Sequence, residues 1–172
     1  MAAVGATTAN IMTLPFATAV TTVLRSLPVP TPPGDTGRAM SQETVETSQQ
    51  AWDRFMAGDT PGVFALLDPE VEVHEAPNMP GASVYHGHAG WQAQVDKFKE
   101  AFTDLAYERL ECIDCGDENV VSVIQASGRA ASSGIAGEAT YAQVETWRDG
   151  KVASIRYFLS RQDALEAVGL RE

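Results

Sequence analysis

The sequence predicts an α+β fold in which helices come first and an antiparallel sheet follows. Amphipathic helical patterns lie between residues 41 and 102, strand-like runs follow over residues 107–159, and an Asp-Gly pair at 149–150 joins the last two runs. The chain has 172 residues, 44% of them apolar, which suits one domain with a real core. We therefore expect a globular domain over residues 41–172.

Residues 1–40 differ from the rest of the chain, because they are rich in Ala, Thr and Val and end in the Pro/Gly-rich "LPVPTPPGDTG". This composition predicts a flexible extension and linker. The first basic residue, Arg25, follows the apolar part, whereas a secretory signal carries its positive charge first. Two other interpretations of residues 1–40 remain. The natural start of the protein is Met40, or the segment contains a short peptide that docks on a partner.

Apolar residues at helical spacing predict three helices after Met40. The first lies within residues 41–59 and stops at Gly58, and the second begins with Thr60 as its cap and Pro61 in its first position. The clearest stripe predicts the third helix within residues 89–102 and consists of Trp91, Val95, Phe98 and Phe102.

Period-two patterns predict one short strand between the second and third helices and a four-stranded meander after them. The expected strands are Val71–Glu75, Tyr107–Ile113, Val120–Arg129, Ala139–Trp147 and Val152–Leu159. A last helix should begin after Ser160, which forms a capping-box pattern with Asp163, and should end at Gly169.

The Asp149-Gly150 pair predicts a two-residue hairpin turn, since both residues tolerate positive φ. Such a turn fixes the register of its strands. One face should then carry the pairs Trp147 with Val152, Glu145 with Ser154, Gln143 with Arg156, and Tyr141 with Phe158. The opposite face is aliphatic and includes Val144 and Ile155.

The first of these faces has the composition of a ligand pocket, with a few polar groups among apolar walls. Its polar residues are Gln143, Glu145 and Arg156, and its walls are Tyr141, Trp147 and Phe158. The alternative is an Arg/Glu pair on a solvated face, with Trp147 under a helix. Because no remaining helix obviously covers the aliphatic face, we also predict a homodimer packed through that convex face of the sheet.

Charge and composition argue against several classes of partner. The chain has 12 basic and 23 acidic residues, a net charge of −11, and no Lys/Arg cluster. Nucleic acid and membrane partners are therefore not expected. The only cysteines, Cys112 and Cys115, lack the context of a redox or zinc motif and fit a reducing, cytoplasmic setting.

All three histidines lie between Val71 and Trp91. His86 and His88, with His74 and Glu75, could form a metal site, but Gly87 and Gly90 favour a turn there, and we expect no metal and no cofactor. His88 is expected to be solvated at the start of the third helix.

Acid/base chemistry is the other interpretation of this segment. His74 and Glu75 are adjacent on a strand, so only one of them can face a pocket. Glu75 is favoured as a base because it shares a face with Val71 and Val73, His74 is the alternative, and it stays open that neither is catalytic. Tyr85 and Trp91 are expected to shape the mouth of the pocket.

Several motifs resemble the SnoaL-like branch of the nuclear-transport-factor-2-like superfamily, which also contains ketosteroid isomerase and polyketide cyclases. The resemblance covers about residues 43–170, and its most specific parts are "DPEVEVH", "RDGKV" and "ALEAVGL". It implies a cone-shaped curved sheet, mixed or antiparallel, wrapped around three N-terminal helices, with a short C-terminal helix. It also implies one hydrophobic cavity per subunit and, commonly, a dimer.

Such a resemblance predicts fold better than chemistry. The acid/base aspartate of the family's polyketide cyclases corresponds to Ser160, which has no useful pKa for proton transfer. We therefore keep two hypotheses for a small hydrophobic ligand. One is a cofactor-independent isomerase, cyclase or dehydratase, with Glu75 or His74 as base and Arg156 with Tyr141 stabilising an oxyanion. The other is a non-catalytic binder or accessory dimer.

Overall fold

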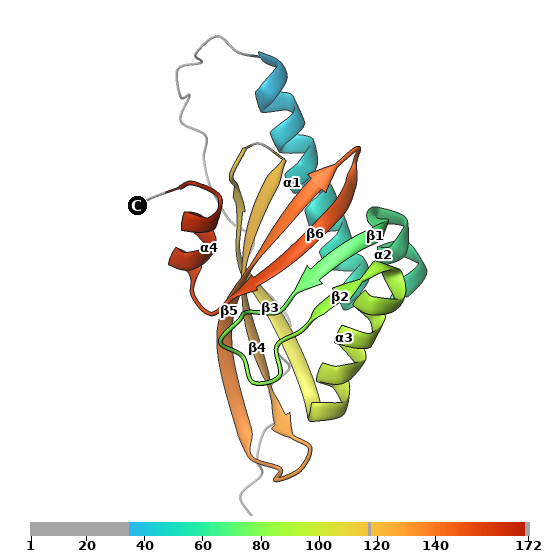
Figure 1. The fold of residues 1–172 in the computed structure, drawn as a ribbon, viewed down its shortest axis with the longest axis vertical. Coiled ribbons are helices and arrows are strands. Elements are labelled where there is room, and N and C mark those ends of the chain that lie inside the picture. Colours follow the sequence, from blue (N-terminus) through green and yellow to red (C-terminus); the bar gives the residue numbers. More distant parts are fainter. Residues whose placement is uncertain (1–34, 117, 171–172) are drawn as a thin grey trace, which may run out of the picture. The chain divides into compact units, whose positions relative to one another are not determined.

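The computed structural model describes residues 35–116 and 118–170, which belong to one compact unit of the chain. Its helices are α1 (Asp35–Met56), α2 (Thr60–Leu66), α3 (Gly87–Ala101) and α4 (Arg161–Ala167). Its strands are β1 (Leu67–His74), β2 (Val84–His86), β3 (Phe102–Asp114), β4 (Asn119–Ala130), β5 (Ala136–Arg148) and β6 (Lys151–Phe158). The predicted α+β class and order of elements are confirmed (Figure 1). Most of the predicted extension over residues 1–40 lies outside the described residues, and its last residues belong to α1.

The described strands form one mixed sheet in the order β2-β1-β6-β5-β4-β3. Strands β3 to β6 form the predicted antiparallel meander. β1 joins it in parallel beside β6, and the short β2, which the sequence patterns did not reveal, pairs antiparallel with β1. β2 and β3 are edge strands, so the sheet is not closed.

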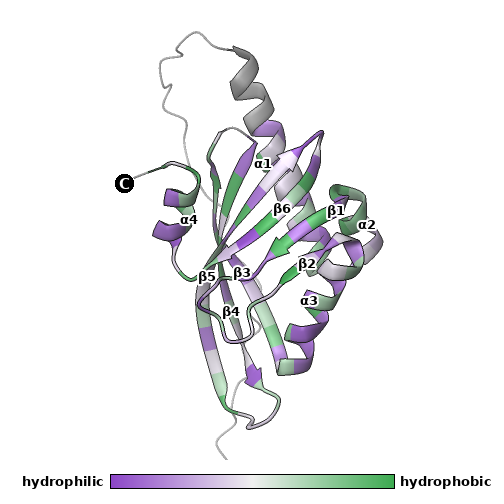
Figure 2. Ribbon diagram, viewed as in Figure 1, coloured by the Kyte–Doolittle hydropathy of each residue, from purple (hydrophilic) through white to green (hydrophobic). Residues whose placement is uncertain are grey.

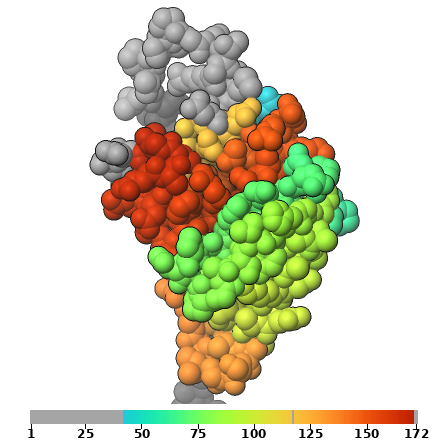
Figure 3. All heavy atoms as spheres, in the orientation of Figure 1, coloured from blue at the N-terminus to red at the C-terminus, as the bar shows by residue number. Residues whose placement is uncertain are grey.

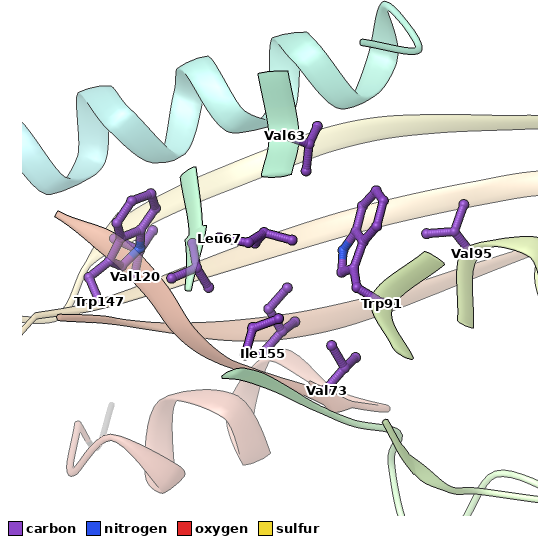
Figure 4. Close-up of a cluster of buried hydrophobic side chains, with 10 residues drawn as sticks. Val63, Leu67, Val73, Trp91, Val95, Val120, Trp147 and Ile155 are labelled. Atoms are coloured by element: carbon purple, nitrogen blue, oxygen red, sulfur yellow. The ribbon is translucent and has the colours of Figure 1, made fainter. Parts of the chain in front are cut away.

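Helices cover both faces of this sheet. On the inner face, residues of α2 and α3 pack with strand residues in a cluster of buried side chains (Figure 4), and Phe55 of α1 packs against the same cluster. On the outer face, Ala164 and Leu165 of α4 pack with Val121, Ala142 and Val144. The expectation that no helix covers the aliphatic face is therefore wrong, because α4 folds back onto it.

Hydropathy along the ribbon follows this layering. In Figure 2, α3 and α4 each carry both hydrophilic and hydrophobic residues, and the two kinds also alternate along strands such as β1. In the space-filling view, residues of α4 occupy one part of the visible face, and residues of β1, β2 and α3 occupy another part (Figure 3). Within the described ranges, no helix has the length and apolar character needed to cross a bilayer.

The ends of the short helices test two of the predicted caps. Ser160 caps α4 as predicted, because its hydroxyl accepts a hydrogen bond of 3.1 Å from the backbone N–H of Asp163. The predicted cap of α2 is wrong. Asp59 takes that place and accepts the N–H of Gly62 at 3.0 Å, so Thr60 is the first helical residue.

The β5–β6 turn forms as predicted, with φ of 50° at Asp149 and 73° at Gly150. The register beyond it is wrong, however. Trp147 pairs with Val152, but a bulge then shifts the ladder by one residue, so that Gln143 pairs with Tyr157 and Val144 with Arg156. A one-residue shift moves every later side chain of one strand to the other face.

Candidate functional site

The main pocket lies between the inner face of the sheet and helices α1 to α3, and has a volume of about 420 Å³. Its walls are mostly apolar and aromatic, and every helix and long strand of this side contributes to them. The polar side chains that line it include Glu75, Gln94, Tyr107, Arg109, Tyr141, Gln143, Glu145 and Tyr157. Apolar walls with a few polar groups are typical of small-molecule sites.

Glu145 is a buried acidic group of this pocket. The residue is 5% exposed, and its two carboxylate oxygens accept hydrogen bonds from the Gln143 amide at 2.7 Å and from the Trp147 indole N–H at 3.2 Å. Burial raises the pKa of Glu145, and the Ser48 hydroxyl, the Arg109 charge and these two donors only partly oppose the rise. No cation among the described residues forms an ion pair with Glu145 within 4.0 Å, so this group can exchange a proton nearer to neutral pH than an ordinary glutamate.

We expect the raised pKa of Glu145 to make stability depend on pH. Because the folded-state pKa lies above the ordinary value of 4.5, the favourable contribution is complete below that value and is lost as the pH rises through the folded-state pKa. We compare the free energies of unfolding of Glu145→Gln and the wild type in urea. As the pH rises from about 4 to about 8, the stability of Glu145→Gln relative to the wild type should increase by at least about 1 kcal/mol. Glu108→Gln, at an exposed position on β3, serves as the control, and parallel pH profiles for wild type and Glu145→Gln would contradict the expectation.

Arg109 of β3 is a site residue that the sequence patterns did not indicate. Its guanidinium donates to the Ser48 carbonyl at 3.1 Å and to the Gln49 side chain at 3.2 Å. It also lies 4.8 Å from the centroid of the Trp52 ring. These contacts with α1 hold a positive charge in the pocket wall, near enough to Glu145 to lower the pKa of that carboxyl.

Glu75 lines the pocket, as its strand parity predicted. Its side chain is 1% exposed and pairs with Lys97 of α3 at 2.8 Å. It also accepts the backbone N–H of Ser83 at 3.0 Å. Lys97 in turn contacts the Tyr85 hydroxyl at 3.2 Å, and its own pKa is raised, chiefly by the hydrogen bond to Glu75. The pair fastens the segment after β1 to α3.

The histidines lie away from the interior of the pocket. His74 is adjacent to Glu75 but points to the other face of β1, where its Nε2 lies 3.0 Å from the carboxylate of Glu72. His86 of β2 lies 3.8 Å from the same carboxylate. His88 was expected to be solvated, but it is half-buried, stacks on Phe64 with ring centroids 4.5 Å apart, and contacts the Leu67 carbonyl.

The described residues contain no cluster of His, Cys, Asp and Glu side chains that could hold a metal ion. Cys112 and Cys115 are free thiols, and burial raises the pKa of Cys115.

The structure brings together six of the ten site residues predicted from the sequence. These pocket-lining residues are Glu75, Trp91, Tyr141, Gln143, Glu145 and Phe158. Trp147 is buried behind them and binds Glu145. Arg156, His74 and Tyr85 lie outside the lining.

Arg156 lies outside because of the bulge. It pairs with Val144 on the outer face and lies 5.8 Å from the centroid of the Phe158 ring. Tyr157 takes the inner position opposite Gln143. The sequence did carry one signal of this arrangement. Ile155 and Tyr157 lie on the same face of β6, and large apolar side chains such as these favour the buried face.

Fold and site together define a small α+β domain with an apolar pocket between a mixed sheet and three helices. The SnoaL-like domain family matches residues 48–155. This chain belongs to that family, which confirms the resemblance seen in its motifs. Among curated protein sequences, none matches the chain.

Solved structures share the fold across the same part of the chain. An NTF2-like protein from Burkholderia xenovorans LB400 is 25% identical, with a TM-score of 0.59 over 74% of this chain and 96% of that chain. TerC is 18% identical, with a TM-score of 0.60 over 74% and 99%. A protein from Jannaschia sp. CCS1, described provisionally as a SnoaL-like polyketide cyclase, is 19% identical, with a TM-score of 0.60 over 76% and 94%.

Proposed function

We propose that this protein binds a small, largely apolar molecule in the pocket and catalyses proton transfer on it without a cofactor. The observation that carries the proposal is Glu145, a buried carboxyl group with a raised pKa, without an ion-pair partner among the described residues, at the wall of an apolar pocket. Perturbed acids in pockets are candidates for general acid/base catalysis.

The proposed chemistry is proton abstraction next to a carbonyl. The carboxylate of Glu145 takes a proton from the adjacent carbon, the electron pair of the broken C–H bond forms a C=C bond, and the carbonyl oxygen gains the negative charge. Protonated Glu145 then returns the proton to the same carbon or to another one. Arg109 supplies positive charge in the same wall, which favours the charged intermediate.

Glu75 is the second candidate base. It is less suited to the role, because its carboxylate is held in an ion pair with Lys97, whereas Glu145 has no ion-pair partner among the described residues. We assign Glu75 to holding the pocket wall, and we assign no catalytic role to His74 or Arg156, whose side chains lie outside the pocket lining.

Similar structures support a ligand of this class. TerC was co-crystallised with polyporic acid, and the Jannaschia protein is described provisionally as a SnoaL-like polyketide cyclase. A non-catalytic binder or accessory protein is the second candidate function. Ser160 favours it, because this residue stands where the family's cyclases carry an acid and is engaged as the cap of α4.

The bicyclic ketone 2-tetralone provides a test of both functions. In D₂O, wild-type protein should exchange the protons next to the carbonyl faster than buffer does, as followed by NMR. Glu145→Gln should lower the protein-dependent rate about 100-fold, whereas Glu108→Gln should not change it. Binding of 2-tetralone without accelerated exchange would refute the enzyme and favour the binder.

A further inference from the structure

The inner face of β5 changes in character along the pocket. Glu145 and Gln143 lie at one end of the part of β5 that lines the pocket, and Ala139 and Gly137 lie at the other end. All four share a face, because no bulge interrupts the β4–β5 ladder and side chains alternate along a strand. From Glu145 to Gly137 the strand covers roughly 26 Å, at about 3.3 Å per residue. The pocket is therefore elongated, with its buried acid near one end.

Small residues form the inner face of the sheet at the other end. Ala139 pairs with Ala126, and Gly137 pairs with Gly128, so both strands leave space in front of the sheet there. Apart from neighbours in the chain, a Cβ atom at Gly137 would meet no atom within 4 Å, whereas one at Gly128 would lie 3.2 Å from the carbonyl oxygen of Thr103. The close approach of β3 thus explains Gly128, but packing does not require glycine at position 137.

The backbone does not require glycine at position 137 either. The φ angle of Gly137 lies outside the left-handed region, so a larger residue would fit the same backbone. Glycine inside a strand costs stability, because it has no side chain to pack and loses more conformational freedom on folding. The space in front of Gly137 is therefore available to whatever the pocket holds.

This end of the pocket is open to solvent. Ala139 and Gly137 are exposed although they line the pocket. Phe102 at the start of β3 and Leu159 after β6 also line it, and they are 38% and 50% exposed. The β4–β5 hairpin extends beyond the last turn of α3 (Figure 1), so the helix ends before the sheet does. The open end thus has an apolar rim, and exposed apolar surface of this kind marks binding sites.

We propose that the ligand is a carbonyl compound with a long unbranched apolar chain, which runs along the inner face of β5 and leaves the pocket past Gly137. The position of its carbonyl group rests on the proposed function, which places that group at Glu145. The volume of about 420 Å³, spread over the length of this strand, makes a narrow channel. A chain fills such a channel better than a fused ring system does, and burial of its methylene groups supplies affinity. Gly137 and Ala139 are then specificity-determining residues, because larger side chains there would block the chain.

Two keto acids test the length of the channel. In 9-oxodecanoic acid and 17-oxooctadecanoic acid, a methyl ketone lies at one end of the chain and a carboxylate at the other. Only the longer chain lets the carboxylate stay in water while the ketone reaches Glu145. Burying a carboxylate is costly and each buried methylene adds affinity, so wild-type protein should bind the longer acid at least about 100-fold more tightly in submicellar equilibrium titrations. 2-Tetralone should displace it, because both carbonyl groups occupy the same end of the pocket.

Leucine substitutions test the path of the chain. The affinity for the longer acid relative to that for 2-tetralone should fall at least about tenfold in Gly137→Leu and in Ala139→Leu, since each change removes room for the chain. Ala136→Leu is the matched control. It adds the same side chain to the opposite face of β5, outside the pocket lining, and should leave that ratio within about twofold. If one of the first two variants fails to fold, the other carries the test.

The outcomes separate this proposal from the proposed function. If neither 2-tetralone nor either acid binds, both fail. If 2-tetralone binds but the longer acid binds no more tightly than the shorter one, the chain-bearing ligand is refuted and the pocket-binding function stands. If the longer acid is preferred but both leucine variants keep the wild-type ratio, the path past Gly137 is refuted.

Discussion

Replacing Trp91 with alanine is expected to lower the free energy of unfolding by about 4 kcal/mol. Trp91 is 6% exposed and belongs to the inner cluster of buried residues. Its ring makes edge contacts with Phe55 and Phe64, at centroid distances of 6.1 and 5.8 Å. Figure 4 shows it extending from α3 among the side chains of that cluster. Truncation therefore removes contacts with two helices as well as with the sheet.

Chemical denaturation followed by circular dichroism measures this loss. Trp52→Ala is the comparison, because Trp52 is a half-buried tryptophan on α1 and should cost about 2 kcal/mol or less. Equal losses for the two variants would mean that Trp91 does not anchor α3 to the inner face of the sheet.

Replacing Lys97 with methionine is expected to destabilise the protein by about 2 kcal/mol at neutral pH. The change leaves the carboxylate of Glu75, 1% exposed, without its cation, and an unpaired buried charge is costly. The estimate is below the usual range for buried pairs because the side chain of Lys97 is 43% exposed, so water screens part of the interaction.

The pH dependence gives this prediction its sign. In the wild type, the hydrogen bond to Glu75 raises the pKa of Lys97 above 10.5. The stabilisation that protonated Lys97 gains from its pair with Glu75 is therefore complete below that pH. It is lost as the pH rises through the raised folded-state pKa of Lys97.

A double-mutant cycle checks the cause of the loss. Adding Glu75→Gln to Lys97→Met removes the unpaired charge and should recover part of the lost stability in urea unfolding. If the double variant is less stable than Lys97→Met by the full effect of Glu75→Gln alone, the two residues are not coupled and the ion pair does not stabilise the fold.

The sequence by itself determined the class of fold and the inner face of β5. Local chemistry accounts for this success: the Asp149-Gly150 turn, the Ser160 cap and the stripe that includes Trp91 each act within a few residues. Strand alternation sufficed to place Tyr141, Gln143 and Glu145 on one side, because the parity of a strand is independent of its neighbours.

Tertiary structure alone decided which groups meet these residues. The bulge in β6 exchanges Arg156 for Tyr157 on the inner face, and a bulge depends on how both strands pack rather than on the turn that joins them. Arg109 reaches the pocket wall from β3, and Lys97 of α3 pairs with Glu75, although each lies far in sequence from its acidic neighbour. Such contacts arise only when distant segments fold together, so no local pattern in the sequence encodes them.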